Sequence, residues 1–133
     1  MAARPEVCVG AVCVHDGALL LVRRGRGPAA GEWSVPGGRV EAGETLHEAV
    51  VRETAEETAL EVVVDHFLGW TERIDDDHHF VILDFAVTAL DAAAPLAAGD
   101  DAAEVAWVPI GELLDLALVP GLLDFLGDAG ALG

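Results

Sequence analysis

Residues 38–60 read GRVEAGETLHEAVVRETAEETAL, and this stretch decides the fold that we predict for the chain. Thr45 and Glu48 have the T-x-x-E spacing of a capping box, in which each side chain accepts a hydrogen bond from the other residue's backbone amide at a helix start. A helix is therefore expected from about Thr45 to about Ala59. The preceding Pro36-Gly37-Gly38 predicts a break in regular structure.

The second half of this helix gathers carboxylates on one face. At about 100° per residue, Glu53 and Glu57 share a stripe and Glu56 lies one row over. Residues 41–61 contain seven glutamates and one arginine, so ion pairs within the segment leave most of this charge unpaired. A divalent cation would neutralise it, and oxygen-only ligands favour Mg²⁺, Mn²⁺ or Ca²⁺ over zinc. A solvated acidic helix face is the alternative interpretation.

Strands are predicted on both sides of this helix. Before it, the apolar run 7–14 predicts a buried strand, Asp16-Gly17 a tight turn, and 19–24 the partner strand of a hairpin. After it, strands are expected at 61–70, 80–89 and 105–108, with loops at 75–77 and 92–101 and leucine-rich helical segments near 113–116 and 122–126. This order predicts one α/β domain over residues 1–133, with a mixed sheet packed between helices.

The strongly acidic composition argues against anionic macromolecules as partners. The chain has 24 acidic and 7 basic residues, a formal net charge of −17 and no lysine, so nucleic acids and anionic membranes are poor partners. A P-loop is excluded because it needs a lysine. No apolar run approaches the ~18 residues of a membrane span, and no signal-peptide pattern is seen, so a cytoplasmic location is expected. Halophilic adaptation is another explanation for the acidity.

Aromatic residues and cysteines are expected mainly in the interior. Cys8 and Cys13 lie five apart on a predicted strand, so they face opposite sides and cannot bridge. Trp33, Trp70 and Trp107 are expected to pack, with stacking on a nucleobase as the alternative for Trp33.

The spacing of glycine, glutamate and arginine in residues 38–60 resembles the Nudix box, G-x5-E-x7-R-E-U-x-E-E-x-G-U, where U is a bulky apolar residue. The matches are Gly38, Glu44, Arg52, Glu53, Glu56, Glu57 and Leu60. The stretch departs at Thr54, where the family has an aliphatic residue, and at Ala59, where it has glycine for the turn after the helix. Residues 33–38, WSVPGG, look like the usual lead-in to the box.

This resemblance implies a Nudix fold, an α/β/α sandwich with a central mixed β-sheet. It implies that Glu53, Glu56 and Glu57 hold Mg²⁺, with Mn²⁺ as a substitute and the Gly37 carbonyl as a further ligand. Arg52 would pair with the catalytic glutamate, and Glu44 would brace the loop and helix.

The resemblance also suggests residues that meet the substrate. Arg23 is similar in position to a phosphate-contacting arginine, and Gly38 is placed beside the substrate. His79 is a candidate contact to a base or ribose, with an ordinary strand-end histidine as the alternative. For the general base, Glu104 is favoured over its loop neighbours Asp100 and Asp101, while Glu53 and Glu56 remain alternatives.

Residues 79–85 and 99–107 resemble a compact bacterial group of ADP-ribose-pyrophosphatase-like proteins. This implies hydrolysis of a phosphoanhydride bond in ADP-ribose, giving AMP and ribose 5-phosphate. MutT-like hydrolysis of a (d)NTP, including oxidised ones, is the runner-up, followed by nucleotide sugars. A non-catalytic nucleotide-sensing Nudix module is the hypothesis of another class. The expected partner is thus a small nucleotide, and the C-terminal leucines form core or a homodimer surface.

Overall fold

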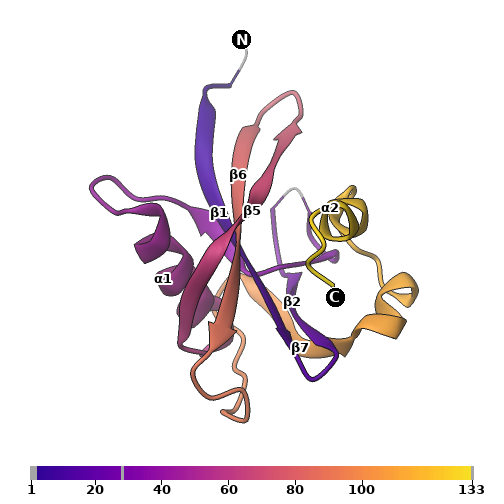
Figure 1. The fold of residues 1–133 in the computed structure, drawn as a ribbon. Helices are drawn as coiled ribbons and strands as arrows, with labels where there is room; N and C mark the ends of the chain where they lie inside the picture. Colours follow the sequence, from indigo (N-terminus) through magenta and orange to yellow (C-terminus); the bar gives the residue numbers. More distant parts are fainter. Residues whose placement is uncertain (1–2, 28, 133) are drawn as a thin grey trace.

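The computed structural model describes residues 3–27 and 29–132. Along the chain its elements are β1 (Pro5–His15), β2 (Ala18–Arg24), β3 (Trp33–Ser34), β4 (Gly37–Arg39), α1 (Leu46–Thr58), β5 (Val62–Ile74), β6 (His79–Ala89), β7 (Ala102–Pro109), the 3-10 helix η1 (Ile110–Asp115) and α2 (Leu122–Asp128) (Figure 1). None of the helices in this described part has the length and apolar character needed to cross a bilayer.

The sheet is mixed, as predicted. β1 runs parallel to β6, and β6 pairs antiparallel with β5. β4 pairs with the first half of β1, while β2 pairs with both β3 and β7. β1 turns into β2 through Asp16 and Gly17, whose φ angles of 49° and 74° suit a tight hairpin turn.

Two apolar cores lie on opposite sides of the sheet. One joins Val9, Ala11 and Cys13 of β1 to Ala49 and Val50 of α1. The other joins Val12 to β2, η1 and Leu126 of α2. Figure 1 accordingly shows α1 and α2 on opposite sides of the long strands. The predicted sandwich follows from this alternation along β1, because successive side chains of a strand point to opposite faces.

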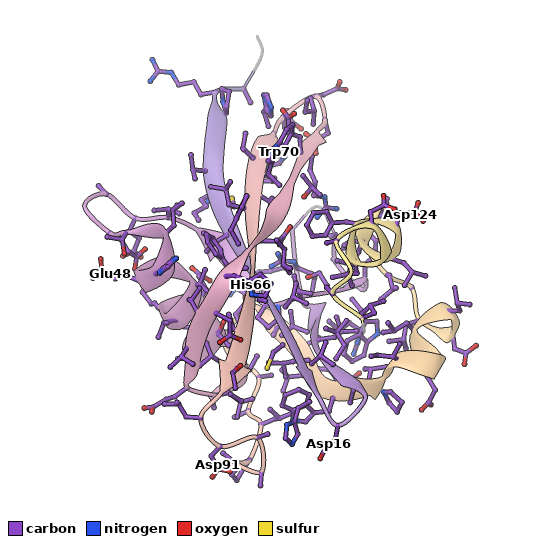
Figure 2. All side chains as sticks on the ribbon, viewed as in Figure 1. Asp16, Glu48, His66, Trp70, Asp91 and Asp124 are labelled. Atoms are coloured by element: carbon purple, nitrogen blue, oxygen red, sulfur yellow. The ribbon has the colours of Figure 1, made fainter. Side chains whose placement is uncertain are left out.

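The cysteines behave as expected. Cys8 and Cys13 are both buried and free. Two of the three tryptophans pack as expected, because Trp33 and Trp107 lie against the two cores. Trp70 instead projects from β5 with 61% of its surface exposed (Figure 2), so the expectation that it packs was wrong. β5 is the last strand of the order β3-β2-β1-β6-β5, so it lies at the edge of the sheet.

The capping box of α1 is confirmed. The Glu48 amide donates to Thr45 Oγ1 at 3.1 Å, and the Thr45 amide donates to Glu48 Oε1 at 2.9 Å. Both departures from the Nudix box are accommodated. Thr54 is fully buried, and its hydroxyl donates to the Val50 carbonyl at 2.7 Å. Ala59 adopts the left-handed conformation, with φ 69°, so the turn is kept without glycine.

Two local predictions needed correction. Residues 37–39 form strand β4 where a break was expected, because Gly37 can lie flat against β1; a Cβ on Gly37 would come 2.1 Å from the Val9 carbonyl oxygen. β5 continues to Ile74, well beyond residue 70, since its hairpin with β6 stays paired to the turn. The helical segment predicted near 113–116 is present as the 3-10 helix η1.

Candidate active site

A cavity of about 990 Å³ opens where α1, β4, β1 and β6 meet. Its volume lies at the upper end of the range for small-molecule sites, roughly 300–1,000 Å³. Five of the predicted site residues line it: Gly37, Gly38, Glu53, Glu56 and Glu57. The fold therefore brings the acidic end of the predicted helix to the wall of a ligand-sized space.

Glu57 is the most enclosed of the three glutamates. Its side chain is 10% exposed, and Oε1 accepts a hydrogen bond from the Gly37 amide at 2.7 Å. Arg24 Nη1 lies 3.7 Å from Oε2. Burial raises the pKa of Glu57 to about 7, although the Gly37 amide and Arg24 both oppose that shift. Glu57 is thus a desolvated carboxyl fixed to the strand that carries Gly37.

Arg52 holds the other acids in place. It contacts Glu44 bidentately, and one of its terminal nitrogens also donates to Glu53 at 2.8 Å and to Glu56 at 3.3 Å. Its second terminal nitrogen donates to the Arg39 carbonyl at 3.1 Å. These bonds raise the pKa of Arg52 further above its ordinary value, with Glu44 as the largest cause. Arg52 therefore remains a cation that orients Glu53 and Glu56.

Glu53 and Glu56 differ in how far they are desolvated. The Glu53 side chain is 15% exposed and that of Glu56 is 60% exposed. Burial raises the pKa of Glu53. Gly38 makes room for this carboxylate, since a Cβ on Gly38 would come 2.5 Å from Glu53 Oε2. The glycine at position 38 thus lets an acid reach the cavity beside β4.

The residues present fit a hard divalent cation. Glu53, Glu56 and Glu57 offer only oxygen, which suits Mg²⁺ and Mn²⁺. Glu53 and Glu56 already meet at a single Arg52 nitrogen. Within residues 3–27 and 29–132, however, no three acidic, histidine or cysteine side chains form a ready-made metal cluster. Each carboxylate is held by a protein donor, so a cation would have to compete with Arg52 and the Gly37 amide.

Two arginines that the sequence reasoning passed over stand near these acids. Arg24 and Arg26 both line the cavity, together with Asp100 and Asp101. Arg26 pairs with Asp101 at 2.7 Å. Such guanidinium groups can bind phosphate oxygens bidentately. The sequence could have indicated Arg24, because it follows Arg23 at the end of a predicted strand. Successive side chains of a strand point to opposite faces, so either arginine could face the site.

The remaining predicted residues do not line the cavity. Arg23 and Glu104 face each other across β2 and β7 and form an ion pair at 2.8 Å. His79 Nε2 lies 2.8 Å from Glu72 Oε2. Trp33 packs against the core beneath α2. The structure thus separates these four side chains from the glutamates.

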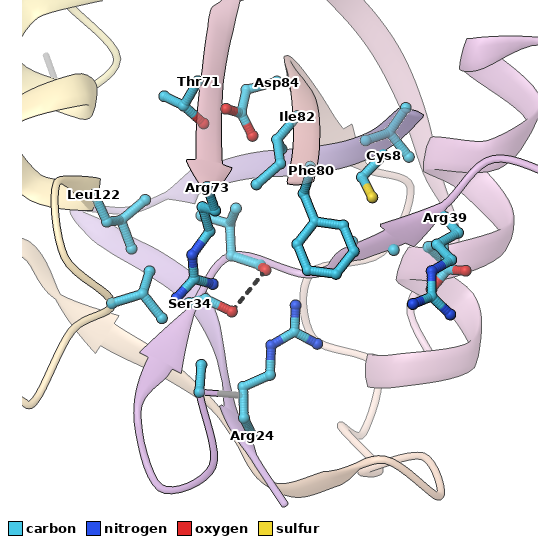
Figure 3. Close-up of a pocket in the computed structure, with 18 of the residues that line it drawn as sticks. Cys8, Arg24, Ser34, Arg39, Thr71, Arg73, Phe80, Ile82, Asp84 and Leu122 are labelled. Carbon is cyan, nitrogen blue, oxygen red and sulfur yellow. Dashed lines mark hydrogen bonds between the residues drawn. The ribbon is translucent and has the colours of Figure 1, made fainter. Parts of the chain in front are cut away.

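The cavity has a second, less polar region that the sequence did not reveal. Phe80, Ile82 and Asp84 of β6 line it, and Figure 3 shows them with Arg24 and Arg39 around the same space. The Arg39 guanidinium lies 5.7 Å from the centre of the Phe80 ring, within the range of a cation–π contact. The site therefore joins an acidic wall to an apolar one.

The family model of the NUDIX domain matches residues 4–128. The chain belongs to the Nudix family. This confirms the resemblance carried by residues 38–60 and, with it, the predicted fold and the prediction of a Nudix hydrolase.

Individual proteins that are similar to this Nudix chain are also pyrophosphatases, diphosphatases or MutT proteins by name. An ADP-ribose pyrophosphatase of Methanocaldococcus jannaschii is 38% identical over 115 residues, covering 85% of this chain and 67% of the relative. A putative 8-oxo-dGTP diphosphatase 2 of Mycobacterium tuberculosis is 34% identical over 128 residues, covering 92% and 86%. The crystal structure of a MutT protein from Methanosarcina mazei Go1 superimposes with a TM-score of 0.84 at 25% identity, covering 98% of this chain and 96% of that one.

Proposed function

We propose that this Nudix hydrolase uses Mg²⁺ to cut a phosphoanhydride bond in a nucleoside diphosphate linked to another group, with ADP-ribose as the favoured substrate. The observation that carries the proposal is the shared cavity in which Glu53, Glu56 and Glu57 face a space also lined by Arg24 and Arg26. Acids that can hold a cation and guanidinium groups that can hold phosphate are the two requirements for binding a metal–diphosphate.

Glu53, Glu56 and Glu57 would hold the cation, with the Gly37 carbonyl as a further ligand. The bound cation would neutralise phosphate charge and lower the pKa of the attacking water. Arg52 keeps Glu53 and Glu56 together, and the Gly37 amide fixes Glu57. Of the neighbours Arg23 and Arg24, only Arg24 lines the cavity, so Arg24 takes the phosphate-binding role that the resemblance assigned to Arg23.

The general base must lie within hydrogen-bond reach of the attacking water. Asp100 and Asp101 line the cavity, whereas Glu104 is paired with Arg23 outside it. Asp101 is itself engaged by Arg26. Among the three loop acids, Asp100 is therefore the best placed, and it replaces Glu104 as our favoured base.

The relatives support two substrates. The relative named ADP-ribose pyrophosphatase supports the linked nucleoside diphosphate. The relative named putative 8-oxo-dGTP diphosphatase supports the MutT-like alternative. A substrate panel with Mg²⁺ and with Mn²⁺ tests the proposal: ADP-ribose, nucleotide sugars, dNTPs and 8-oxo-dGTP.

AMP and ribose 5-phosphate from ADP-ribose are the expected products. Pyrophosphate and a nucleoside monophosphate from 8-oxo-dGTP would instead establish the alternative. If the folded protein binds these nucleotides but cleaves none of them with either metal, the hydrolase proposal fails and the nucleotide-sensing hypothesis takes its place. Undiminished turnover in excess EDTA would overturn the metal's role.

A further inference from the structure

Asp84 of β6 lies between two glycines. Its register partner on β1 is Gly10, and its register partner on β5 is Gly69. The Asp84 carboxyl leans over Gly10: a Cβ added to Gly10 would come 2.1 Å from Asp84 Oδ1. The register partners of Asp84 therefore carry no side chain, and Thr71 of β5 lies beside the carboxyl in the cavity (Figure 3).

The Asp84 carboxyl lines the cavity and has no side-chain partner in the described part of the chain. The residue is 5% exposed, and no side chain among the described residues hydrogen-bonds or ion-pairs with it. Burial is the sole cause that raises its pKa, to about 7, and no neighbouring cation opposes the shift. No fully buried side-chain oxygen of the described residues lacks a partner, so the Asp84 carboxyl keeps access to the cavity, where solvent or a ligand can donate a hydrogen bond to it.

The surroundings of Asp84 suit a flat, apolar ligand. Val35 lies against Gly10 on one side, and the Phe125 ring lies 3.2 Å from where a Cβ on Gly69 would be. Ile82 lines the same cavity along β6, as Figure 3 shows. Apolar walls with one buried polar group are the usual form of a small-molecule recognition site.

Asp84 is also aligned with the reaction centre. Gly37, Gly10 and Asp84 occupy one row across β4, β1 and β6. Two strand spacings separate the ends of this row, roughly 10 Å. Since Gly37 holds Glu57, a nucleotide whose diphosphate meets the glutamates can direct its base along the row toward Asp84.

We propose that Asp84 selects the base of the nucleotide substrate by accepting a hydrogen bond from an exocyclic amino group. The proposal rests on the proposed function only in taking a nucleotide as the occupant. A cation is a poor alternative occupant, because no cluster of three acidic, histidine or cysteine side chains occurs in the part of the chain that the structure describes. A ribose hydroxyl is the other donor that a nucleotide offers, and the comparison of AMP with dAMP distinguishes it from the base.

Binding of mononucleotides tests the proposal without requiring hydrolysis. GMP and IMP differ only by an exocyclic amino group, whereas in AMP and IMP, and in CMP and UMP, the amino group of one member is replaced by an oxo group beside a ring N–H in the other. Calorimetric titration with Mg²⁺ is expected to show at least one pair in which the amino member binds about 10-fold more tightly or better. Bidentate base contacts give ~1–3 kcal/mol of discrimination, and ~1.4 kcal/mol is tenfold.

The variant Asp84→Leu has nearly the same shape and no acceptor. We expect it to lose the preference and, because an unpaired buried carboxyl is removed, to have a higher Tm. A residue with only a structural role would lower Tm on replacement. Asp65→Leu is the matched control, since Asp65 is an exposed acid on the same sheet whose partner is Thr88. If Asp84→Leu does not fold, Asp84→Asn is expected to weaken the preference at least about 5-fold, because an amide presents a donor as readily as an acceptor.

Equal affinities within all three pairs for the native protein, or absence of binding by every mononucleotide, would overturn the proposal. So would a preference that survives in Asp84→Leu. A difference between AMP and dAMP that disappears in Asp84→Leu would assign the carboxyl to the ribose and equally refute base selection. Failure of hydrolysis alone, with the base preference intact, would count against the proposed function and not against Asp84.

Discussion

Arg52 and Glu44 form a two-point contact: Nε lies 2.6 Å from Oε2, and Nη2 lies 2.9 Å from Oε1. The same carboxyl also accepts the Glu41 amide at 3.1 Å, so it ties the loop before α1 to the helix. Arg52 in turn reaches Glu53 and Glu56. One guanidinium thus links the loop that precedes the helix to the acids that line the cavity.

Replacement of Arg52 by lysine tests this link. Lysine keeps the charge but cannot form the planar two-point contact. We expect turnover to fall at least ~10-fold while circular dichroism shows an unchanged fold, since Glu53 and Glu56 lose their common donor. Turnover equal to the native value would contradict the orienting role. Arg23→Lys is a matched control, because Arg23 also pairs with a glutamate but does not line the cavity.

Glu57→Gln is expected to reduce turnover at least ~100-fold. The amide keeps the size of the side chain but removes a charged ligand for the cation. The fold should remain, because the Gly37 amide can still donate to the amide oxygen. Glu61→Gln, an exposed neighbour just past α1, serves as the control. Native turnover in Glu57→Gln would refute the metal-holding role.

The two adjacent arginines of β2 provide a paired test. Arg24 lines the cavity, whereas Arg23 is bound to Glu104. We expect Arg24→Ala to lower kcat/KM at least ~10-fold through lost phosphate contacts, and Arg23→Ala to change it less than ~3-fold. Steady-state kinetics on both variants show which of the two arginines contacts the phosphate. The reverse order of effects would restore Arg23 as the phosphate contact.

Ala59→Gly is expected to stabilise the protein by about 1 kcal/mol. Ala59 has φ 69° at the end of α1, and a non-glycine residue pays roughly 1–2 kcal/mol there, partly offset by the greater entropy of unfolded glycine. Urea unfolding measures the change. Ala55→Gly, at an exposed position inside the same helix, should instead destabilise by ~1 kcal/mol. A loss of stability in Ala59→Gly would contradict the left-handed turn.

Stability in EDTA is expected to fall as the pH rises from about 4.5 to about 7. Burial raises the pKa of Glu57 from 4.5 to about 7, and that of Asp84 from 3.8 to about 7. Between those values the folded protein holds protons that the unfolded chain has released, so raising the pH favours unfolding. Glu44 has the opposite effect at lower pH, because its hydrogen bond with Arg52 lowers its pKa from 4.5 to about 2. The stability that Glu44 contributes is therefore lost as the pH falls from about 4.5 to about 2.

Thermal melts across this pH range measure the effect. The decline should be shallower in Glu57→Gln, which removes one of the three carboxyls whose pKa is raised by burial and leaves the rest of the acidic surface unchanged. A decline as steep as that of the native protein would show that general charge repulsion, and not Glu57, is its cause.

Local features of the chain could be predicted from the sequence because they depend on neighbours along the chain. The capping box at Thr45 and Glu48, the hairpin turn at Asp16 and Gly17, and the common stripe of Glu53 and Glu57 all follow from helix or turn geometry. The spacing of residues 38–60 was enough to identify the Nudix family, which the match over residues 4–128 confirms.

The tertiary structure decided which side chains share one space. Arg23 and Arg24 are equivalent as sequence, yet strand alternation sends one to Glu104 and the other to the cavity. Asp84 is the one charged residue of the segment 80–89, and only the register with Gly10 and Gly69 shows that it faces two positions without a side chain. Sequence determined the acidic helix and its family because those depend on local spacing, whereas strand pairing between distant segments determined the cavity around it.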